Sequence, residues 1–446
     1  MPSWHCTRRN IGSRTVFGIL PLLLWLASPG YADSLPASAG PATNQALSLL
    51  ACRQIALEQQ PSLAATRASL KAALDRANAL ENLRVPTLLA RDLPIRRKQS
   101  ALGVTIAQGG ITQAESETLY AVTYSYLAAL YAEQQIRIAD KQIRERLNGL
   151  LTLVTDESTR KARRDVILEQ HENLVKSFLQ TLDGRVQEAR QGKYRALAAL
   201  REAMGVGADF VFVLPQRDLP CPRANPQGAE LVALALARRG ELVQVNTLVE
   251  VICLEIDAQA TSCRPNMRTF ASGSDIHAKL IPSGDVGGLE YRPAMVGPEM
   301  PPSLTGSREA RMQQARDYYQ RSQAVAAKAH NLILLEVEDL YRRWLDKSRK
   351  AAHLEVAYRE SLTFSEKMKE SFNRRMPSYP NVDEVVNAGL VTTRLQLEWK
   401  EAHYQSLLAL AALERATAGG FYVDFDTAPA CEPRPLNLPN ETTDTP

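Results

Sequence analysis

The sequence lacks the motifs that carry most known enzyme chemistry. It contains no G-x-S-x-G, no Walker phosphate loop, no G-x-G-x-x-G and no H-E-x-x-H. It also has no C-x-x-C, and the histidines beyond the first residues are scattered, at His171, His277, His330, His353 and His403. Because metal sites need clustered ligands, the sequence predicts no metal and no cofactor. We therefore expect a protein that is not an enzyme.

An excess of charge of one sign is also missing. The chain has 53 basic and 49 acidic residues, but Arg8, Arg9 and Arg14 belong to an N-terminal segment that we expect to be removed, which leaves 50 against 49. No basic patch indicates a nucleic-acid partner. Aromatic residues make up only 6% of the 446 residues, whereas alanine and leucine are plentiful. This balance favours long helices over sheets.

No hydrophobic run is long enough to be a convincing membrane span. The apolar run at 16–27 is about half of the ~20 residues that a spanning helix needs, which disfavours a membrane anchor. Basic residues precede the run, and the small residues of SPGYA follow it and end at Ala32. This order is typical of a Sec signal peptide at 1–32, although TRRNI at 7–11 faintly resembles a twin-arginine signal. We expect the mature protein to be exported.

Few cysteines remain after the expected cleavage, and only one pair stands out. Cys221 and Cys431 each follow a short aromatic run, FVFV at 210–213 and FYVDF at 421–425. An exported protein can form disulfides, so these two residues are a candidate pair. The alternative is that both are free surface thiols.

Several long patterns, by contrast, occur twice. ALAALREAMG (196–205) and LALAALERATAGG (408–420) each close a helical stretch, with Ala198–Ala203 matching Ala411–Ala416 at an offset of 213. ALEQQPSL (56–63) also aligns with ALARRGEL (235–242), and YLAALYAEQ (126–134) with EVEDLYRRW (336–344). The chain is therefore predicted to be a duplicated three-helix unit. The expected helices lie near 44–83, 101–154 and 160–204, and again near 228–262, 306–374 and 382–417.

The predicted helices are too long to form a compact core. Apolar and small residues recur at alternating steps of four and three, as in Leu395, Trp399, Ala402 and Ser406, which is the pattern of coiled-coil packing. Helices of about 45–60 residues extend roughly 70–90 Å and must pair along their length. We expect self-association, with a monomeric six-helix bundle as the alternative. The first helical repeat is placed at 33–215, the second at 216–425 and a disordered tail at 426–446.

Together these features resemble the TolC-like outer-membrane efflux protein family. The resemblance rests on the signal peptide, the duplicated long helices, ALEQQPSLAATRASLKAA in the first repeat, VDEVVNA before the last helix and LALAALERATAGG at its end, and it covers about residues 44–420. It implies a homotrimer whose helices form a periplasmic tunnel, with four strands per protomer in a shared outer-membrane barrel. It also implies a periplasmic adaptor protein and an inner-membrane pump as partners, in the envelope of a Gram-negative-type cell.

The expected function is therefore that of one subunit of a passive export tunnel, in a tripartite efflux or type I-like secretion system. The alternative is a periplasmic coiled-coil scaffold or spacer protein that conducts nothing. A tunnel needs a polar inner face along its whole length, whereas a solid scaffold needs apolar seams on all sides.

The sequence departs from the family where the strands are expected. Residues 84–103 include Arg91, Arg96, Arg97 and Lys98, and a Lys or Arg at the bilayer midplane of a strand costs about 2–4 kcal/mol. Residues 264–307 are rich in glycine and in proline, which paired strands tolerate poorly. We expect a turn or short irregular hairpin at 86–97 and a loop with at most short strands at 264–306. The predicted fold is mainly α, a duplicated three-helix unit of very long coiled-coil helices forming a trimeric tunnel, with reduced or absent barrel strands.

The resemblance places the best site candidates at the mouth of the tunnel. Asp383 matches the first acidic position of the family's mouth-lining segment, whereas the second falls on Val386 unless Glu384 supplies that charge. Alternatively, both acids simply cap their helix, where carboxylates suit the helix dipole. Residues that form a charged rim at the two tips are candidates for docking an adaptor, with solvated turns as the alternative. They are Arg374, Arg375 and Tyr379 at one tip, and Asp156, Glu157, Arg160, Arg164 and Asp165 at the other.

Overall fold

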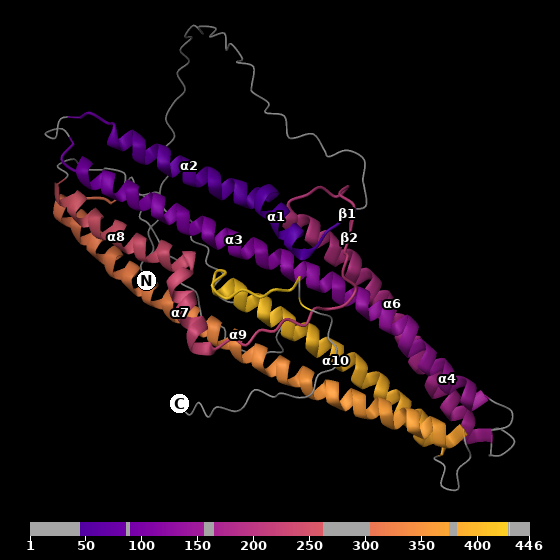
Figure 1. Ribbon diagram of the computed structural model, residues 1–446. Helices are drawn as coiled ribbons and strands as arrows, with labels where there is room; N and C mark the ends of the chain where they lie inside the picture. The colour runs from indigo at the N-terminus through magenta and orange to yellow at the C-terminus, as the bar shows by residue number, and fades with distance from the viewer. Residues whose placement is uncertain are drawn as a thin grey trace, which may run out of the picture. The chain divides into compact units, whose positions relative to one another are not determined.

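The computed structural model describes residues 45–85, 90–155, 165–261, 304–373, 381–426 and 428. All of these described residues belong to one compact unit. Within the described residues, long helices that run alongside one another make up nearly all of the regular structure (Figure 1).

The helices fall into two sets that follow the same order. The first set is α1 (Leu49–Gln59), α2 (Pro61–Glu81), α3 (Leu93–Arg137), the π-helix η1 (Ile138–Ile143), α4 (Arg144–Thr155) and α6 (Asp165–Met204). The second set is α7 (Gly228–Arg238), α8 (Gly240–Thr261), α9 (Arg308–Asn373) and α10 (Val382–Ala416). A short helix and a longer one, then a very long helix, then a final long helix appear in each set. The predicted duplication is confirmed.

The first two helices of each set break at corresponding residues. Gln60 separates α1 from α2 with φ −64° and ψ 119°, and Arg239 separates α7 from α8 with φ −65° and ψ 125°. Proline follows the first break, where its fixed φ suits the start of α2. Both breaks lie in the ALEQQPSL and ALARRGEL pair, at the same place in each.

The last helix of each set also ends in the same way. Gly205, with φ 73°, follows α6, and the N–H of Val206 donates to the carbonyl oxygen of Arg201 at 3.1 Å. Ala418, with φ 48°, follows α10, and the N–H of Gly419 donates to the carbonyl oxygen of Glu414 at 3.1 Å. This left-handed closure satisfies carbonyls that the helix leaves open. The repeated ALREA and ALERA segments therefore close the last helix of each repeat with the same geometry.

The helices form two levels with four helices side by side in each (Figure 1). At the linker end, marked by Glu81, Leu93, Thr261 and Arg308, the order across the layer is α2, α3, α8, α9. At the tip, where α4, α6, α9 and α10 begin or end, the order is α6, α4, α10, α9. The segment formed by α3, η1 and α4 crosses both levels, and so does α9.

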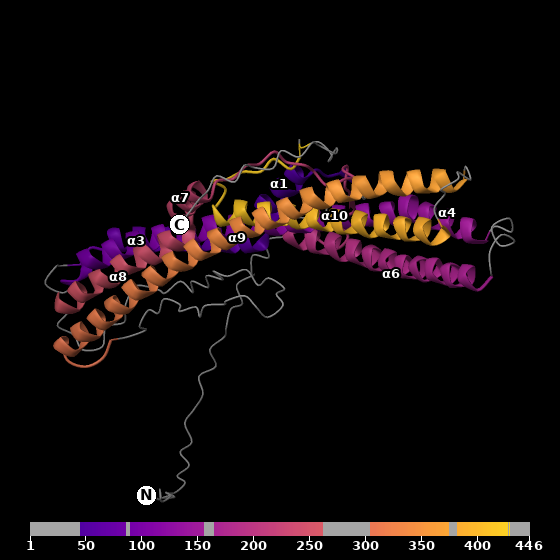
Figure 2. The ribbon, with the colours of Figure 1, turned by 90° about the horizontal axis from the view of Figure 1, so that it is seen from below.

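A short pairing of strands lies halfway along the helices. β1 (Gln45–Ala46) pairs in parallel with β2 (Phe212–Val213), with Gln45 opposite Phe212. These are the strands found in the part of the chain that the structure describes. Figure 2 shows α1, α7 and the connecting stretches on one side of the helical layer at this level, which we call the belt.

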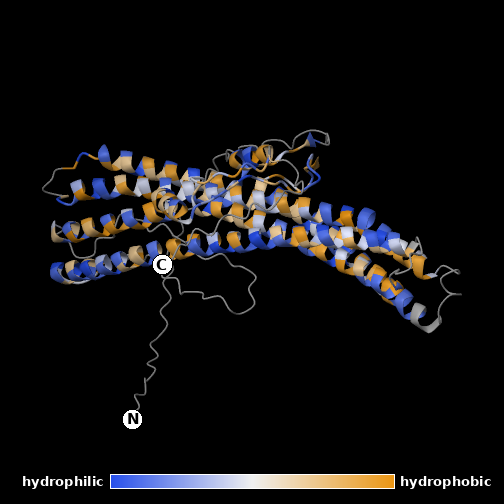
Figure 3. Cartoon of the chain, turned by 60° about the horizontal axis from the view of Figure 1, so that its bottom comes forward, coloured by the Kyte–Doolittle hydropathy of each residue, from blue (hydrophilic) through white to orange (hydrophobic). Residues whose placement is uncertain are grey.

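Two apolar clusters hold the layer together. The larger one surrounds the belt and includes Leu130, Leu200 and Leu413, all fully buried. The smaller one lies towards the tip, between α4, α6 and α10. Hydrophobic and hydrophilic residues alternate along every helix (Figure 3). Among the described helices, none has a stretch apolar enough and long enough to cross a bilayer.

The prediction for the first linker, at 86–97, needs a correction. The expectation of a turn or hairpin at 86–97 is wrong for Leu93–Arg97, which form the first turns of α3. Pro94 suits a helix start, and an acid from another helix neutralises Arg96, as described below. Residues 86–89 and most of 264–306 lie outside the described residues. The single helix predicted at 101–154 is also interrupted by η1.

Candidate functional site

The start of α10 carries the two acids that the sequence placed at the tunnel mouth. Asn381 precedes the helix, and the carboxylate of Glu384 accepts the N–H of Asn381 at 3.0 Å. The two residues form a capping box, in which side chain and backbone satisfy one another at a helix start. Glu384 is therefore engaged with its own helix.

Asp383 instead connects the two repeats. Its carboxylate lies 3.2 Å from Nε2 of His171, which belongs to α6 of the first repeat. The His171 side chain is 15% exposed and that of Asp383 is 47% exposed, so the pair lies partly in solvent. A contact of this kind holds the tip ends of α6 and α10 together.

Val386 explains the departure from the family's acidic pattern. Its side chain is fully buried (0% exposed), and it packs in the tip cluster with Val154 of α4 and Val175 of α6. A carboxylate at this position would lose its hydration among valines and leucines, which is costly for an unpaired charge. In this chain the second acidic position faces the apolar core.

For the remaining tip candidates, the structure describes no side chain. Asp165 begins α6, but only its backbone is described. The others lie outside the described residues, so their proposed role in docking stays a prediction; they are Arg374, Arg375, Tyr379, Asp156, Glu157, Arg160 and Arg164.

A buried group of charged residues lies at the belt and was not predicted from the sequence. Glu336 of α9 accepts hydrogen bonds from both Arg239, at the break between α7 and α8, and Arg415, near the end of α10. Arg239 also pairs with Glu241 at 2.6 Å. Burial lowers the pKa of Arg239, but the neighbouring Glu336 and Glu241 outweigh it, so the pKa rises above its usual value. These charges hold three helices of the second repeat at one point.

A second buried pair lies close to the first. Arg53 of α1 donates to Glu414 of α10 at 2.8 Å, and its guanidinium also donates to the hydroxyl of Thr123 of α3. Burial raises the pKa of Glu414 in spite of the nearby arginine. Glu414 and Arg415 are the charged residues of the ALERA segment. This segment therefore ties α10 to the first repeat through Glu414 and to the second through Arg415.

Comparison with known proteins adds to this geometry. No protein-family model and no curated protein sequence matches the chain. The outer-membrane channel OprN superposes with a TM-score of 0.64 at 15% identity, over 86% of this chain and 95% of the channel. VceC of Vibrio cholerae, an outer membrane protein, gives 0.57 at 16% identity over 84% and 97%. The open MtrE outer membrane channel of Neisseria gonorrhoeae gives 0.53 at 14% identity over 88% and 98%.

The chain has the fold of the TolC-like outer-membrane channels. At these identities the likeness concerns the fold, and it spans nearly the whole length of each of these channels. The resemblance drawn from the repeated sequence segments is confirmed at that level.

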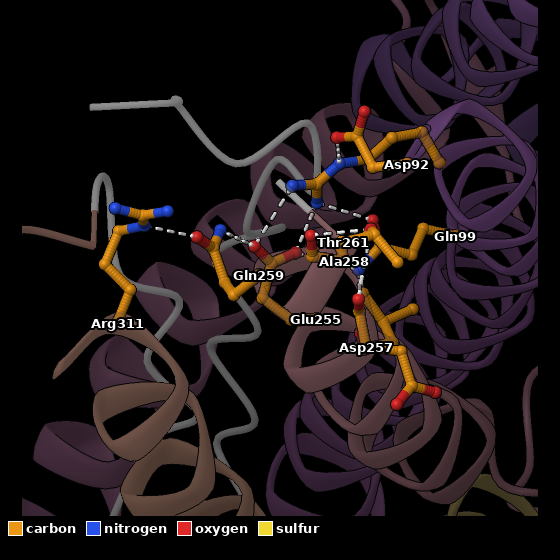
Figure 4. Close-up of polar contacts among 10 residues, drawn as sticks. Asp92, Gln99, Glu255, Asp257, Ala258, Gln259, Thr261 and Arg311 are labelled. Atoms are coloured by element: carbon orange, nitrogen blue, oxygen red, sulfur yellow. Dashed lines mark hydrogen bonds and ion pairs between the residues drawn. The ribbon is translucent and has the colours of Figure 1, made fainter. Parts of the chain in front are cut away.

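In this TolC-like fold, a third polar cluster closes the linker end (Figure 4). Arg96 of α3 pairs with Glu255 of α8 and donates to Asp92 at 3.2 Å and to Gln99 at 2.8 Å. Gln259 continues the chain of contacts by donating to Glu255 at 2.6 Å. The side-chain oxygen of Gln259 also accepts a hydrogen bond from Arg311. The cluster therefore joins α3, α8 and α9 near their ends at the linkers.

The structure describes only one of the two cysteines in the predicted disulfide. Cys221 is disulfide-bonded, and Cys52 and Cys253 are free thiols. Cys431 lies outside the described residues, so its pairing with Cys221 stays a prediction.

One sequence signal could have found the buried charges. Glu336 lies three residues after Ile333 and four before Leu340, and both of these neighbours are buried. A charged residue on an apolar stripe of a helix must find a partner or lose stability. The sequence contains that conflict, but it does not say which helix supplies the partner.

Proposed function

We propose that this chain is one subunit of a passive tunnel that carries export through the periplasm to the outer membrane. The observation that supports it most directly is the likeness in fold to outer-membrane channels over 95–98% of the length of OprN, VceC and MtrE. The exported substrate would pass along the helices without chemical change, as part of a tripartite efflux or type I-like secretion system.

The two edges of the helical layer support assembly into a closed ring. On one edge, α2 and α6 expose large apolar side chains, including Phe178 and Tyr194. On the other edge, α9 exposes Leu335 and Phe364, the latter to 56%. Because the two edges differ, copies would associate edge to opposite edge, and such contacts form a closed ring when the rotation from copy to copy completes a full turn. We propose a homotrimer on the strength of the fold.

The tip is the proposed meeting point with partner proteins. In this proposal the mouth is lined in part by Asp383, which belongs to the end of α10 that also contacts the first repeat. A periplasmic adaptor would dock on the charged turns of the tip and connect the tunnel to an inner-membrane pump. The chain would lie in the periplasm and outer membrane of a Gram-negative-type cell.

Cysteine cross-linking tests the ring. In a background with Cys253→Ser, the double variant Phe178→Cys and Phe364→Cys places one thiol on each edge near the tip. A short bis-maleimide should then give dimers and covalent trimers, whereas either single variant should not give trimers. Val391→Cys on α10, which is exposed but lies within the layer, is the matched control. A monomer by light scattering in both detergent and buffer, without cross-linking, would contradict the ring.

Reconstitution separates a conduit from a scaffold. A conduit should copurify with an adaptor and a pump, and deletion of its gene should raise the cellular content of an exported compound. A scaffold would change the spacing or integrity of the envelope and leave export unaffected. That second result would overturn the proposed function even if the protein were trimeric.

A further inference from the structure

A polar pocket lies beside the π-helix η1, just on the tip side of the belt. It has a volume of about 450 Å³, within the range of sites that hold small molecules. Its wall comes from α3 and η1, from α9 and α10, and from the stretch that follows β2. The residues that matter below are Gln134, Arg137, Lys141, Asp218, Trp399 and Lys400.

The π-helix helps to shape this pocket. The N–H of Arg144 donates to the carbonyl oxygen of Ala139, five residues earlier, which is the wide turn of a π-helix. Ile138, Ala139 and Ile143 face the core, while Lys141 is exposed and lines the pocket. Single π turns inside α-helices are rare and occur often at functional sites.

The pocket has more positive than negative charge. Asp218 already accepts hydrogen bonds from Arg137 and, at 3.0 Å, from Gln134. Burial raises the pKa of Asp218, but these hydrogen bonds outweigh it and lower the pKa. Lys141 and Lys400 remain, and among the described residues neither ammonium group has a carboxylate within ion-pair distance. Two cations therefore face the pocket without an acid of their own.

Lys400 is held against an aromatic ring. Its Nζ lies 3.6 Å from the centre of the Trp399 ring, and Tyr358 stacks against the same residue with ring centres 5.5 Å apart. A cation over an aromatic face is stabilised, but it still has N–H groups to donate.

Gln134 carries a buried hydrogen-bond acceptor to which no described residue donates. Its side chain is only 3% exposed, and its amide nitrogen donates to Asp218. Its Oε1 is buried and accepts no hydrogen bond from any described residue. A buried acceptor without a donor costs about 1–3 kcal/mol. The pocket thus offers hydrogen-bond donors from two lysines, whereas Oε1 of Gln134 has almost no accessible surface and lies behind the pocket wall.

We propose that this pocket binds a small oxyanion. Carboxylate or phosphate oxygens accept hydrogen bonds from Lys400 and Lys141. A small carboxylate and a phosphate share this chemistry. The site is independent of whether the protein conducts an export substrate.

The charge state of Lys400 predicts how binding should depend on pH. Burial, together with the positive charge of Arg137, lowers its pKa to about 8, while Asp218 and Glu355 act in the opposite direction. Lys141 and the buried His403 are the other titratable groups nearby. A bound anion favours the protonated lysine and raises its pKa. Anion affinity should therefore increase as the pH falls through 8.

Fluorescence of Trp399 provides the measurement. The sequence has tryptophans at 4, 25, 344 and 399, and the first two precede the expected cleavage site. Trp344→Phe in the full mature protein leaves Trp399 as the reporter beside the Lys400 ammonium. Citrate and inorganic phosphate are the two probes, each titrated below and above the pKa of Lys400.

The expected results distinguish the groups involved. At least one probe should saturate, and Lys400→Met should weaken its binding about tenfold or more, as loss of a charged hydrogen bond does. Lys176→Met, which removes a lysine paired with Glu172 on α6, should leave the affinity unchanged.

Two outcomes would overturn the proposal. One is the absence of saturable binding of both probes up to about 10 mM, including the case in which a carboxylate of a neighbouring copy already fills the pocket. The other is an equal anion affinity in the Lys400→Met variant and in the protein that keeps Lys400, which would place any bound anion elsewhere. If Lys400→Met lost binding and its far-UV spectrum also changed, the loss could come from misfolding. Lys400→Arg then decides, because it keeps the positive charge and should retain affinity.

Discussion

Replacing Gly240 by alanine should destabilise the protein, although alanine favours helices more than glycine does. Gly240 is the first residue of α8 and crosses α3 at Gly109. A Cβ at Gly240 would lie 2.0 Å from the carbonyl oxygen of Gly109 and 3.2 Å from the backbone nitrogen of Gln113. Because both obstacles are backbone atoms, no side-chain rotation can relieve the clash.

The size of the effect follows from two opposing contributions. Alanine should gain up to about 1 kcal/mol from helix propensity. Forcing an added methyl group into a tight contact typically costs about 1–3 kcal/mol and sometimes more, and a separation of 2.0 Å requires the two helices themselves to move. We therefore expect a net loss of roughly 2 kcal/mol or more, concentrated where α3 and α8 cross.

Denaturant unfolding followed by far-UV circular dichroism measures this loss, at one fixed protein concentration because assembly contributes to stability. Gly110→Ala is the matched control, since Gly110 is the next residue of α3 and a Cβ there would meet nothing within 4 Å. The control should be as stable as the natural protein or slightly more stable. If Gly240→Ala behaved like Gly110→Ala, the close crossing of α3 and α8 would be refuted.

Further predictions concern charges and cysteines. Glu336→Leu leaves two buried arginines without their shared acid and should cost about 3–5 kcal/mol in unfolding experiments; a loss below about 1 kcal/mol would contradict the buried network. Asp383→Asn should cost only about 0.2–1 kcal/mol but speed hydrogen exchange at the start of α10, and unchanged exchange would argue against the contact between repeats. Burial lowers the pKa of His403 to about 4 from 6.5, so the unfolded chain binds the extra proton and stability should fall as the pH drops from 6.5 towards 4. His403→Gln should flatten that part of the pH profile, and an unchanged profile would assign the dependence to other groups. Non-reducing peptide mapping should recover Cys221 joined to Cys431, and recovery of Cys221 with any other cysteine would disprove the pairing.

Local patterns in the sequence were enough to predict the parts of this protein that depend on local interactions. Helical spacing of apolar residues predicted the long helices, and the repeated segments predicted the duplication that the structure confirms. The breaks at Gln60 and Arg239 and the closures after Gly205 and Ala418 fall within those repeated segments. Each of these features depends on residues within about one or two helical turns, so a linear pattern contains the necessary information.

Which distant residues come into contact could be seen only in the folded protein. Arg96 reads in the sequence as one of four basic residues that disfavour a strand, but its carboxylate partner Glu255 lies 159 positions away and allows α3 to begin early. Gly109 and Gly240 likewise look like ordinary glycines until two helices bring their backbones together. A periodic pattern states which face of a helix is buried and not what covers it, because many pairings of equally apolar faces have similar energies. Only the packed arrangement selects one pairing, and with it the partners of Arg96 and Glu336.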